Sequence, residues 1–174
     1  MFKKCDYVVL DTETTGLDSD ARICEISIID MSGNVLLDTL INPEIEIPSE
    51  AIAIHGITNE MVAHAPVIQS VLNEIKSAIS GKILAIYNAD YDIRLLNQSL
   101  EGGLWDTSDC SYCVMHNYAE YYGEIGPYGD YKWQRLVNAC YQQGVDTSDC
   151  VAHRALGDCQ MTRLLMVEFM EFAG

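Results

Sequence analysis

Basic residues are scarce in this sequence. It has 10 Lys and Arg against 26 Asp and Glu, a net charge of −16, and no Lys or Arg lies between Ile23 and Ile75 or between Leu95 and Tyr131. Long duplex nucleic acid is usually bound by a broad basic face, because phosphate contacts supply much of the affinity. We expect no such face here. A short anionic end remains possible if divalent metal ions supply positive charge, and the acidity also permits a basic protein partner.

Long apolar runs and a secretion signal are also missing. No run approaches the ~18 residues of a membrane-spanning helix, and residues 1–6 lead into an apolar segment without the layout of a signal peptide. The seven cysteines are odd in number and scattered, which favours a reducing compartment over a disulfide framework. We therefore expect a cytoplasmic protein without membrane spans. Cys110 and Cys113 could form half a zinc site, but ordinary reduced cysteines are the expectation because no second close pair exists.

The pattern of apolar residues predicts alternating strands and helices in one domain, residues 1–174. The second and third strands are separated by a turn and should form a hairpin. The whole pattern predicts an α/β sheet with helices packed against it. The expected strands are 7–10, 23–29, 35–41, 83–87 and a weak one at 104–107; the expected helices are a short turn at 55–62, then 66–79, 88–100, one within 111–131, 133–144 and 153–172.

Residues 7–16, Tyr-Val-Val-Leu-Asp-Thr-Glu-Thr-Thr-Gly, end a buried strand with two acids. Asp11 and Glu13 are two positions apart, so an extended backbone directs both carboxylates to the same side. Thr14, Thr15 and Gly16 then supply hydroxyls and a residue free to take positive φ. Two such acids suit a cation, although an isolated pair of this kind more often only ends a strand and opens a turn.

Two further acidic positions follow along the chain. Asp92 comes shortly after the strand that ends near Tyr87, and His153 and Asp158 lie at the start of the last expected helix. Residues just beyond the carboxyl ends of neighbouring strands converge on one crevice. Taken singly, Asp92 could complement a helix dipole, and His153 and Asp158 could be solvated surface residues. Because these acids and the histidine occur in this order and local context, the alternatives are less favoured when all the residues are considered together.

The chain resembles the DnaQ-like 3′–5′ exonucleases of the DEDDh type, which share the ribonuclease H-like fold. The resemblance covers about residues 6–170, and all five expected catalytic residues are present. One departure is Tyr87, which stands where the family commonly has His before Asn-Ala. The motifs are Asp11-Thr12-Glu13-Thr14-Thr15-Gly16, Tyr87-Asn88-Ala89-Asp90-Tyr91-Asp92 and Ala152-His153-Arg154-Ala155-Leu156-Gly157-Asp158-Cys159, with Ile54-His55-Gly56-Ile57-Thr58 resembling a segment that lines the nucleotide pocket.

The resemblance implies a ribonuclease H-like mixed sheet of about five strands, one antiparallel, flanked by helices. It also implies a two-metal hydrolytic site. Oxygen-only ligands suit two Mg²⁺ or Mn²⁺ ions rather than zinc. Asp11 would bridge the ions, and Asp92 would complete the shell directly or through water. The implied catalytic residues are Asp11, Glu13, Asp92, His153 and Asp158, and the four acids among them are the implied metal ligands.

His153 is the candidate general base, because the pKa of histidine lies near neutrality. An offset of five residues turns a helix by about 140°, so His153 and Asp158 cannot share one face of a regular helix. We therefore expect His153 on the loop, or at the first residue, that leads into the last helix.

The resemblance further suggests a pocket for the terminal nucleotide, formed by Thr14, Thr15, His55 and Asn88. Thr14 and Thr15 are equally consistent with a turn. The tyrosines between 112 and 131 could stack unpaired bases, but we expect partly buried packing for most of them. The candidate phosphate contacts are Arg94, Lys132 and Arg154, and the sequence does not decide among them.

The sequence thus predicts a metal-dependent 3′–5′ exonuclease that hydrolyses phosphodiester bonds at single-stranded or frayed 3′ ends of DNA and releases nucleoside monophosphates. One alternative is an exonuclease of the same fold directed at RNA or short oligonucleotides. Another is a proofreading-type subunit that acts mainly within a polymerase or other complex. Because the sequence ends at Gly174, just past the last expected helix, a stand-alone enzyme or an isolated domain is the expectation.

Overall fold

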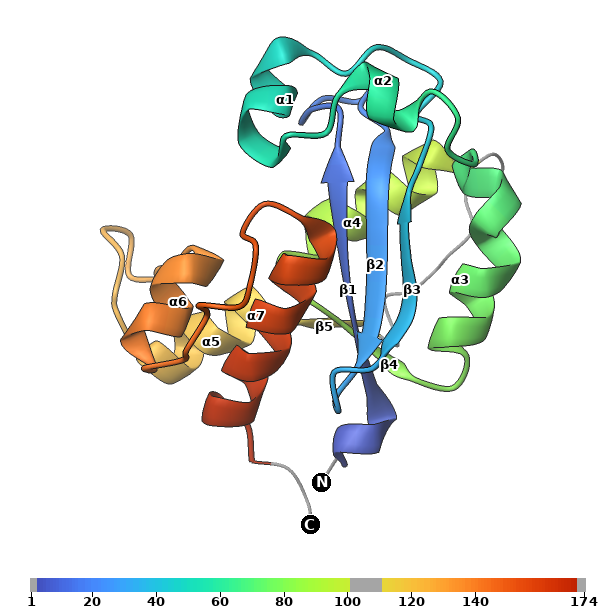
Figure 1. Ribbon diagram of the computed structural model, residues 1–174. Coiled ribbons are helices and arrows are strands. Elements are labelled where there is room, and N and C mark those ends of the chain that lie inside the picture. Colours follow the sequence, from blue (N-terminus) through green and yellow to red (C-terminus); the bar gives the residue numbers. More distant parts are fainter. Residues whose placement is uncertain (1–2, 101–110, 172–174) are drawn as a thin grey trace.

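A five-stranded sheet forms the centre of the protein (Figure 1). The computed structural model describes residues 3–100 and 111–171, so the strand expected at 104–107 and Cys110 lie outside the described residues. The strand order is β3-β2-β1-β4-β5, in which β2 is antiparallel to β1 and β3 while β4 and β5 are parallel to β1. The expected mixed sheet and hairpin are confirmed. The strands are β1 (Tyr7–Thr14), β2 (Ile23–Asp30), β3 (Val35–Leu40), β4 (Ile83–Ile86) and β5 (Ser111–Cys113).

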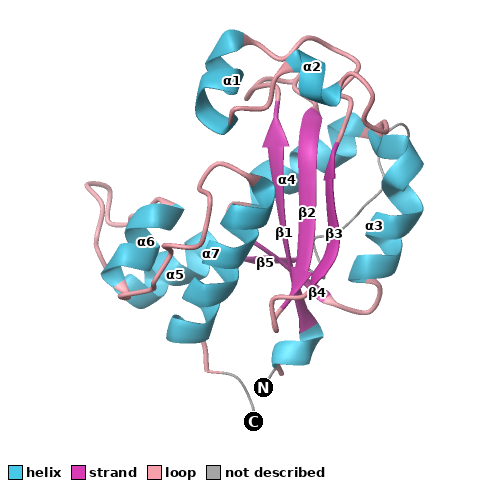
Figure 2. Ribbon diagram, viewed as in Figure 1, coloured by secondary structure: helices cyan, strands magenta, loops and turns pink. Residues whose placement is uncertain are grey.

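Helices cover both faces of this sheet (Figure 2). In β1, Val8 and Leu10 pack into the core beneath α3 and α4, whereas Tyr7 and Val9 pack into the core beneath α5, α6 and α7. Because both faces of β1 are buried, its first four residues are all apolar. The helices of the two layers are α3 (Leu72–Ile79), α4 (Ala89–Ser99), α5 (Val114–Tyr122), α6 (Leu136–Gln142) and α7 (Ala155–Phe169), with 3₁₀ turns η1 (Lys4–Asp6) and η2 (Ile68–Val71).

Two short helices, α1 (Ser49–His55) and α2 (Asn59–Val62), lie beyond the end of the sheet at which β1 ends (Figure 1). Helix α1 corrects the sequence interpretation, because His55 ends a helix rather than opening a helical turn. Only Ala51 and His55 of α1 are buried, so the segment has little apolar periodicity to reveal it. Gly56 at φ 74° terminates α1, a left-handed conformation that favours glycine.

The region after α5 also differs from the expectation. Trp133 lies before α6 and is 58% exposed, so it does not belong to the amphipathic helix predicted for 133–144. Tyr118 is buried and Tyr112 is partly buried, as expected, and Tyr121 and Tyr122 pack against Tyr118 although about half of each remains exposed. The expectation was wrong for Tyr128 and Tyr131, which are exposed. Helix α7 is shorter at both ends than the predicted 153–172, and within the described residues the helices are too short or too polar to cross a bilayer.

Candidate active site

Three carboxylates meet at the carboxyl end of β1. Asp11 and Glu13 belong to the last half of the strand itself rather than following it, and Asp158 lies in the first turn of α7. Within the described part of the chain, one carboxylate oxygen of each residue can be chosen so that the three lie within 4.8 Å of one another. Residues far apart in the sequence are thus brought together because α7 packs across β1 and β2.

Asp92, on α4, lies next to this cluster, and its side chain is hydrogen-bonded to β1. Its Oδ1 accepts hydrogen bonds from the Thr12 amide at 3.1 Å and from the Thr12 hydroxyl at 2.7 Å. The side chain is buried, and its charge is one of the causes that raise the pKa of Asp11. The four acids predicted from the sequence therefore occupy one region, with Asp92 held in place by two donors from β1.

Burial and mutual repulsion raise the pKa values of these acids. Burial is the largest cause in each case, and it raises the pKa of Glu13 to about 8, of Asp92 to about 7 and of Asp158 to about 6. The pKa of Asp11 lies well above its ordinary value, because burial acts together with the charges of Asp92, Asp158, Glu13 and Glu25. A hard divalent cation would offset this repulsion, and an all-oxygen donor set suits such an ion.

His153 lies two residues before α7 on an exposed loop, which agrees with the helix-geometry argument. Its backbone has φ 59°, an uncommon conformation for a residue other than glycine, and its N–H donates to Asp158 Oδ1 at 3.2 Å. Gly157 allows this loop to lie close to α7: a Cβ added there would be 2.0 Å from the Val151 carbonyl oxygen. The loop that carries His153 is therefore positioned by close backbone packing and by the carboxylate of Asp158.

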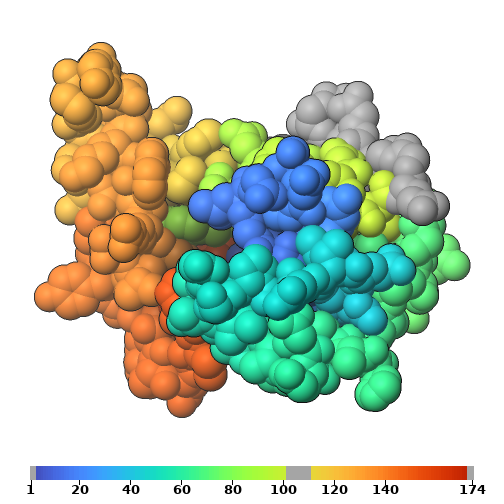
Figure 3. All heavy atoms as spheres, turned by 90° about the horizontal axis from the view of Figure 1, so that it is seen from above, coloured from blue at the N-terminus to red at the C-terminus, as the bar shows by residue number. Residues whose placement is uncertain are grey.

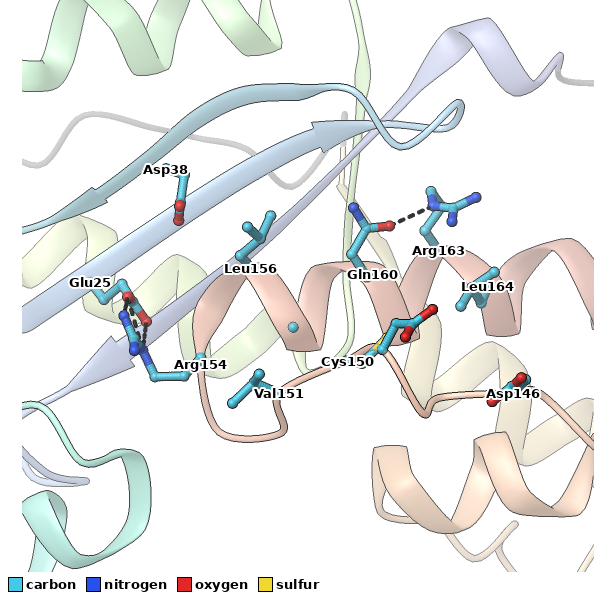
Figure 4. Close-up of a pocket in the computed structure, with 12 residues that line it drawn as sticks. Glu25, Asp38, Asp146, Cys150, Val151, Arg154, Leu156, Gln160, Arg163 and Leu164 are labelled. Atoms are coloured by element: carbon cyan, nitrogen blue, oxygen red, sulfur yellow. Dashed lines mark hydrogen bonds and ion pairs between the residues drawn. The ribbon is translucent and has the colours of Figure 1, made fainter.

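Glu25 is a site residue that the sequence interpretation missed. It lies in β2 directly opposite Glu13 and is buried. Its carboxylate accepts from Arg154 in a two-pronged ion pair, with Nε at 3.1 and 3.0 Å from the two oxygens and one Nη closer still (Figure 4), and it also accepts from the Ala155 amide at 2.9 Å. Glu25 thus fixes the residue after His153 and the first amide of α7.

The signal for Glu25 was present in the sequence. An acid inside the apolar run Ile23-Cys24-Glu25-Ile26 requires a partner, because an unpaired buried charge is costly. The partner, Arg154, was a candidate phosphate contact and is instead engaged by Glu25. Of the other two candidates, Lys132 pairs with Glu124, and Arg94 donates to the carbonyls of Leu17 and Asp18.

A cavity of about 530 Å³ adjoins the acids. The predicted nucleotide contacts Thr14, Thr15, His55 and Asn88 all line it, and Leu17 and Ile54 are exposed beside it. The structure therefore brings together, in one cavity, four residues from the end of β1 and the turn after it, from the end of α1, and from the position directly before α4.

The four lining residues differ in whether their side chains are already hydrogen-bonded within the protein. The Thr14 hydroxyl bonds to Gly16 O and Tyr91 OH, and the Thr15 hydroxyl accepts from the Arg22 amide, so both also serve as turn residues. The His55 Nδ1 accepts from the Ile57 amide, which leaves the proton on Nε2 at 3.2 Å from Thr14 O. Asn88 is exposed, and its side chain accepts no hydrogen bond from the first amides of α4.

Comparisons with known proteins identify the family of this chain. The exonuclease family model RNase_T matches residues 8–166. The chain belongs to this exonuclease family. It is 45% identical to the uncharacterised exonuclease CP81 of Escherichia phage 186, over 90% of this chain and 84% of that one. It is 34% identical to the epsilon subunit of DNA polymerase III of Rickettsia conorii, over 94% of this chain and 73% of that one.

A solved relative supports the same assignment. Exonuclease X in complex with 5′ overhanging duplex DNA superposes with a TM-score of 0.71 at 27% identity, over 94% of this chain and 90% of that one. The exonuclease is thus of the DnaQ type with a ribonuclease H-like fold, as the motifs predicted.

The ion pair between Glu25 and Arg154 should stabilise the exonuclease more than a surface pair does. Glu25→Ala leaves a guanidinium and the Ala155 amide without their acceptor, so we expect a loss of about 1–3 kcal/mol in the free energy of unfolding by urea. The control is Lys132→Ala, which breaks an exposed pair and should cost less than about 1 kcal/mol. Equal losses in the two variants would contradict a special role for Glu25.

The raised pKa values predict how pH affects the metal-free exonuclease. A carboxyl whose pKa is higher in the folded than in the unfolded state binds more protons when folded, so stability falls as pH rises. With folded-state values of about 6 to 8 for Asp158, Asp92 and Glu13, the melting temperature should fall between about pH 4 and pH 8. Mg²⁺ or Mn²⁺ should raise it more at pH 8 than at pH 5. The measurement is calorimetry of the melting temperature with and without metal. A metal-induced increase in melting temperature that does not depend on pH would argue against these acids as the ligands.

Proposed function

We propose that this exonuclease removes nucleotides from single-stranded or frayed 3′ ends of DNA and releases nucleoside monophosphates. The observation that carries the proposal is the meeting of Asp11, Glu13 and Asp158 within 4.8 Å of one another, beside a cavity of about 530 Å³. We propose further that residues 1–174 act as a single catalytic domain.

The acids would hold two Mg²⁺ or Mn²⁺ ions. Asp11, Glu13 and Asp158 are the proposed ligands, with Asp92 completing the shell directly or through water. When bound, such ions polarise the phosphate, lower the pKa of water and stabilise charge on the attacking and leaving oxygens. The protein itself keeps Asp92 oriented through the two donors of Thr12 and keeps Asp158 oriented through the amide of His153.

His153 is the proposed general base. Its imidazole is exposed on the loop beside Asp158, and it would accept a proton from the water that attacks phosphorus. The bond that breaks joins phosphorus to the 3′ oxygen of the preceding nucleotide, so the product is a 5′-monophosphate. Glu25 acts through Arg154 to hold the backbone next to His153, and it is therefore a positioning residue.

The cavity is the proposed pocket for the terminal nucleotide. Asn88 has an exposed amide, and Leu17 and Ile54 offer apolar surface for a base or sugar. Thr14, Thr15 and His55 would shape the pocket through the bonds that fix the turn and α1. Because the three candidate cations have partners within the protein, a short unpaired end fits this site better than a long duplex does.

Asp11→Asn should abolish metal-dependent cleavage, because one charge of the ligand set is lost. The assay is gel analysis of 5′-labelled DNA and RNA single strands with and without Mn²⁺, in which wild-type protein shortens the DNA stepwise from the 3′ end. The metal-free variant should melt no lower than the wild type, since removing a crowded charge relieves repulsion. Full activity of this variant would refute the two-metal proposal.

His153→Ala should lower kcat by about 100- to 10,000-fold, the usual contribution of a positioned base. Added imidazole should restore part of the rate, which a purely structural defect would not allow. The control is His64→Ala, since His64 is also exposed but lies after α2. Near-normal turnover of His153→Ala at neutral pH with Mg²⁺ would remove the residue from this role.

A second candidate is a subunit that acts mainly inside a polymerase complex. The name of the Rickettsia conorii relative, a subunit of DNA polymerase III, is the observation that favours it. Stepwise shortening of DNA by the isolated protein would support an exonuclease. Tight binding to a polymerase without any shortening of DNA would support a polymerase subunit.

A further inference from the structure

The segment between α5 and α6 is a structured hairpin that carries exposed aromatic side chains. The Lys132 amide donates to Glu124 O at 2.8 Å, and the Gly126 amide donates to Asp130 O at 2.7 Å. Gly129, at φ 86°, closes the turn with a bond from its amide to Gly126 O at 3.1 Å. The main chain therefore fixes the shape of the hairpin, although the residue at its tip, Tyr128, is 94% exposed.

Residues 131–135, which lead from the hairpin into α6, alternate between residues bonded to Glu124 and exposed residues. Lys132 and Gln134 both bond to the carboxylate of Glu124, at 2.7 and 2.8 Å. The alternate residues Tyr131, Trp133 and Arg135 are exposed, and the guanidinium of Arg135 makes no ion pair or hydrogen bond within the described residues. We call these last three residues the aromatic platform. The carboxylate of Glu124 in this network is paired with Lys132.

A hydrogen bond connects the platform segment to the residue that precedes Asn88. The Tyr87 hydroxyl donates to the carbonyl of Gln134 at 2.7 Å, and Tyr87 directly precedes Asn88 of the nucleotide cavity. Tyr87 is the position at which the second motif departs from the family pattern, and its hydroxyl makes this link. Viewed from the active-site end, the light-orange hairpin stands across a hollow from the blue turn that follows β1 (Figure 3).

We propose that the aromatic platform binds the single strand upstream of the terminal nucleotide, with bases stacked on Trp133 and Tyr131 and a phosphate paired with Arg135. This inference rests on the proposed exonuclease function. Stacking on aromatic rings suits unpaired bases of any sequence. A free guanidinium is exceptional in a chain with net charge −16, and its charge suits a phosphate better than it suits a basic protein partner.

The first test compares substrates of two lengths. The variants are Trp133→Ala, Arg135→Ala and Tyr131→Ala/Trp133→Ala; the matched control is Tyr141→Ala, an exposed aromatic residue on α6 outside the platform. On oligothymidylate of about 15 nucleotides, the double variant should lose at least about tenfold in kcat/KM, mainly through KM. This loss should exceed any change on a dinucleotide by about fivefold or more. Tyr141→Ala should match wild type on both substrates.

The second test measures contact without catalysis. Trp105 and Trp133 are the two tryptophans of the chain, so a Trp105→Phe variant leaves Trp133 as the only tryptophan reporter. In the Asp11→Asn background without metal, oligothymidylate should quench Trp133 fluorescence by stacking, and the quenching should saturate together with the anisotropy of a labelled oligonucleotide.

Three results separate the possible failures. Equal losses on the long and short substrates, without quenching at saturation, would overturn the platform while leaving the exonuclease function intact. Unchanged nucleic-acid binding, with loss of affinity for a polymerase subunit in the platform variants, would assign the surface to a protein instead. If the wild type cleaves neither substrate, the proposed function fails, and the fluorescence measurement alone then decides whether the platform binds single strands.

Discussion

Repulsion among buried and partly buried carboxylates at the end of β1 is the constraint on which the rest of the structure depends. Asp11, Glu13, Asp92 and Asp158 converge there, and Glu25 lies opposite Glu13 on the next strand. Each added charge raises the pKa of its neighbours, because burial removes the water that would screen them. The fold limits this cost with fixed donors: Thr12 for Asp92, the His153 amide for Asp158, and Arg154 with the Ala155 amide for Glu25.

Within the described residues, no such donor holds the carboxylates of Asp11 and Glu13. The pKa of Glu13 is raised to about 8 even though Arg154 lowers it in part. The start of α7 contributes in the same direction as a cation, because the N-terminus of a helix carries a partial positive charge. The acids of β1 and Asp158 therefore form a compact group of oxygen ligands that suits divalent cations, rather than a diffuse acidic surface.

The scarcity of basic residues has a related consequence for the substrate. Arg154 is used to neutralise Glu25, Lys132 neutralises Glu124, and Arg94 supports the turn after β1. Under the proposed function, the attraction of an anionic substrate would come largely from bound metal, with Arg135 and the aromatic and apolar contacts supplying the remaining affinity. The exposed aromatic residues before α6, and Leu17 and Ile54 beside the cavity, are where such contacts are available.

The sheet and the set of acids could be predicted because their signals are local and mutually consistent. Tyr7–Leu10 is apolar at every position because two cores meet at β1, and the spacing of Asp11 and Glu13 directs both carboxylates to one side. By contrast, α1 has too few buried residues to show a helical period, and Trp133 resembles a core residue in the sequence although the hairpin places it at the surface. Whether a residue such as Trp133 is buried depends on which other elements pack against it.

The sequence by itself determined the exonuclease motifs, their order, and the strand and helix pattern that brings them to one end of a sheet, because these depend on residue type and short spacings. Only the tertiary structure decided that Arg154 pairs with Glu25, that Gly157 admits the Val151 backbone, and that Tyr87 reaches the carbonyl of Gln134. Each of these contacts joins residues whose approach is set by the packing of separate elements. The side chains alone do not specify that packing, since the same arginine or tyrosine could equally have faced solvent.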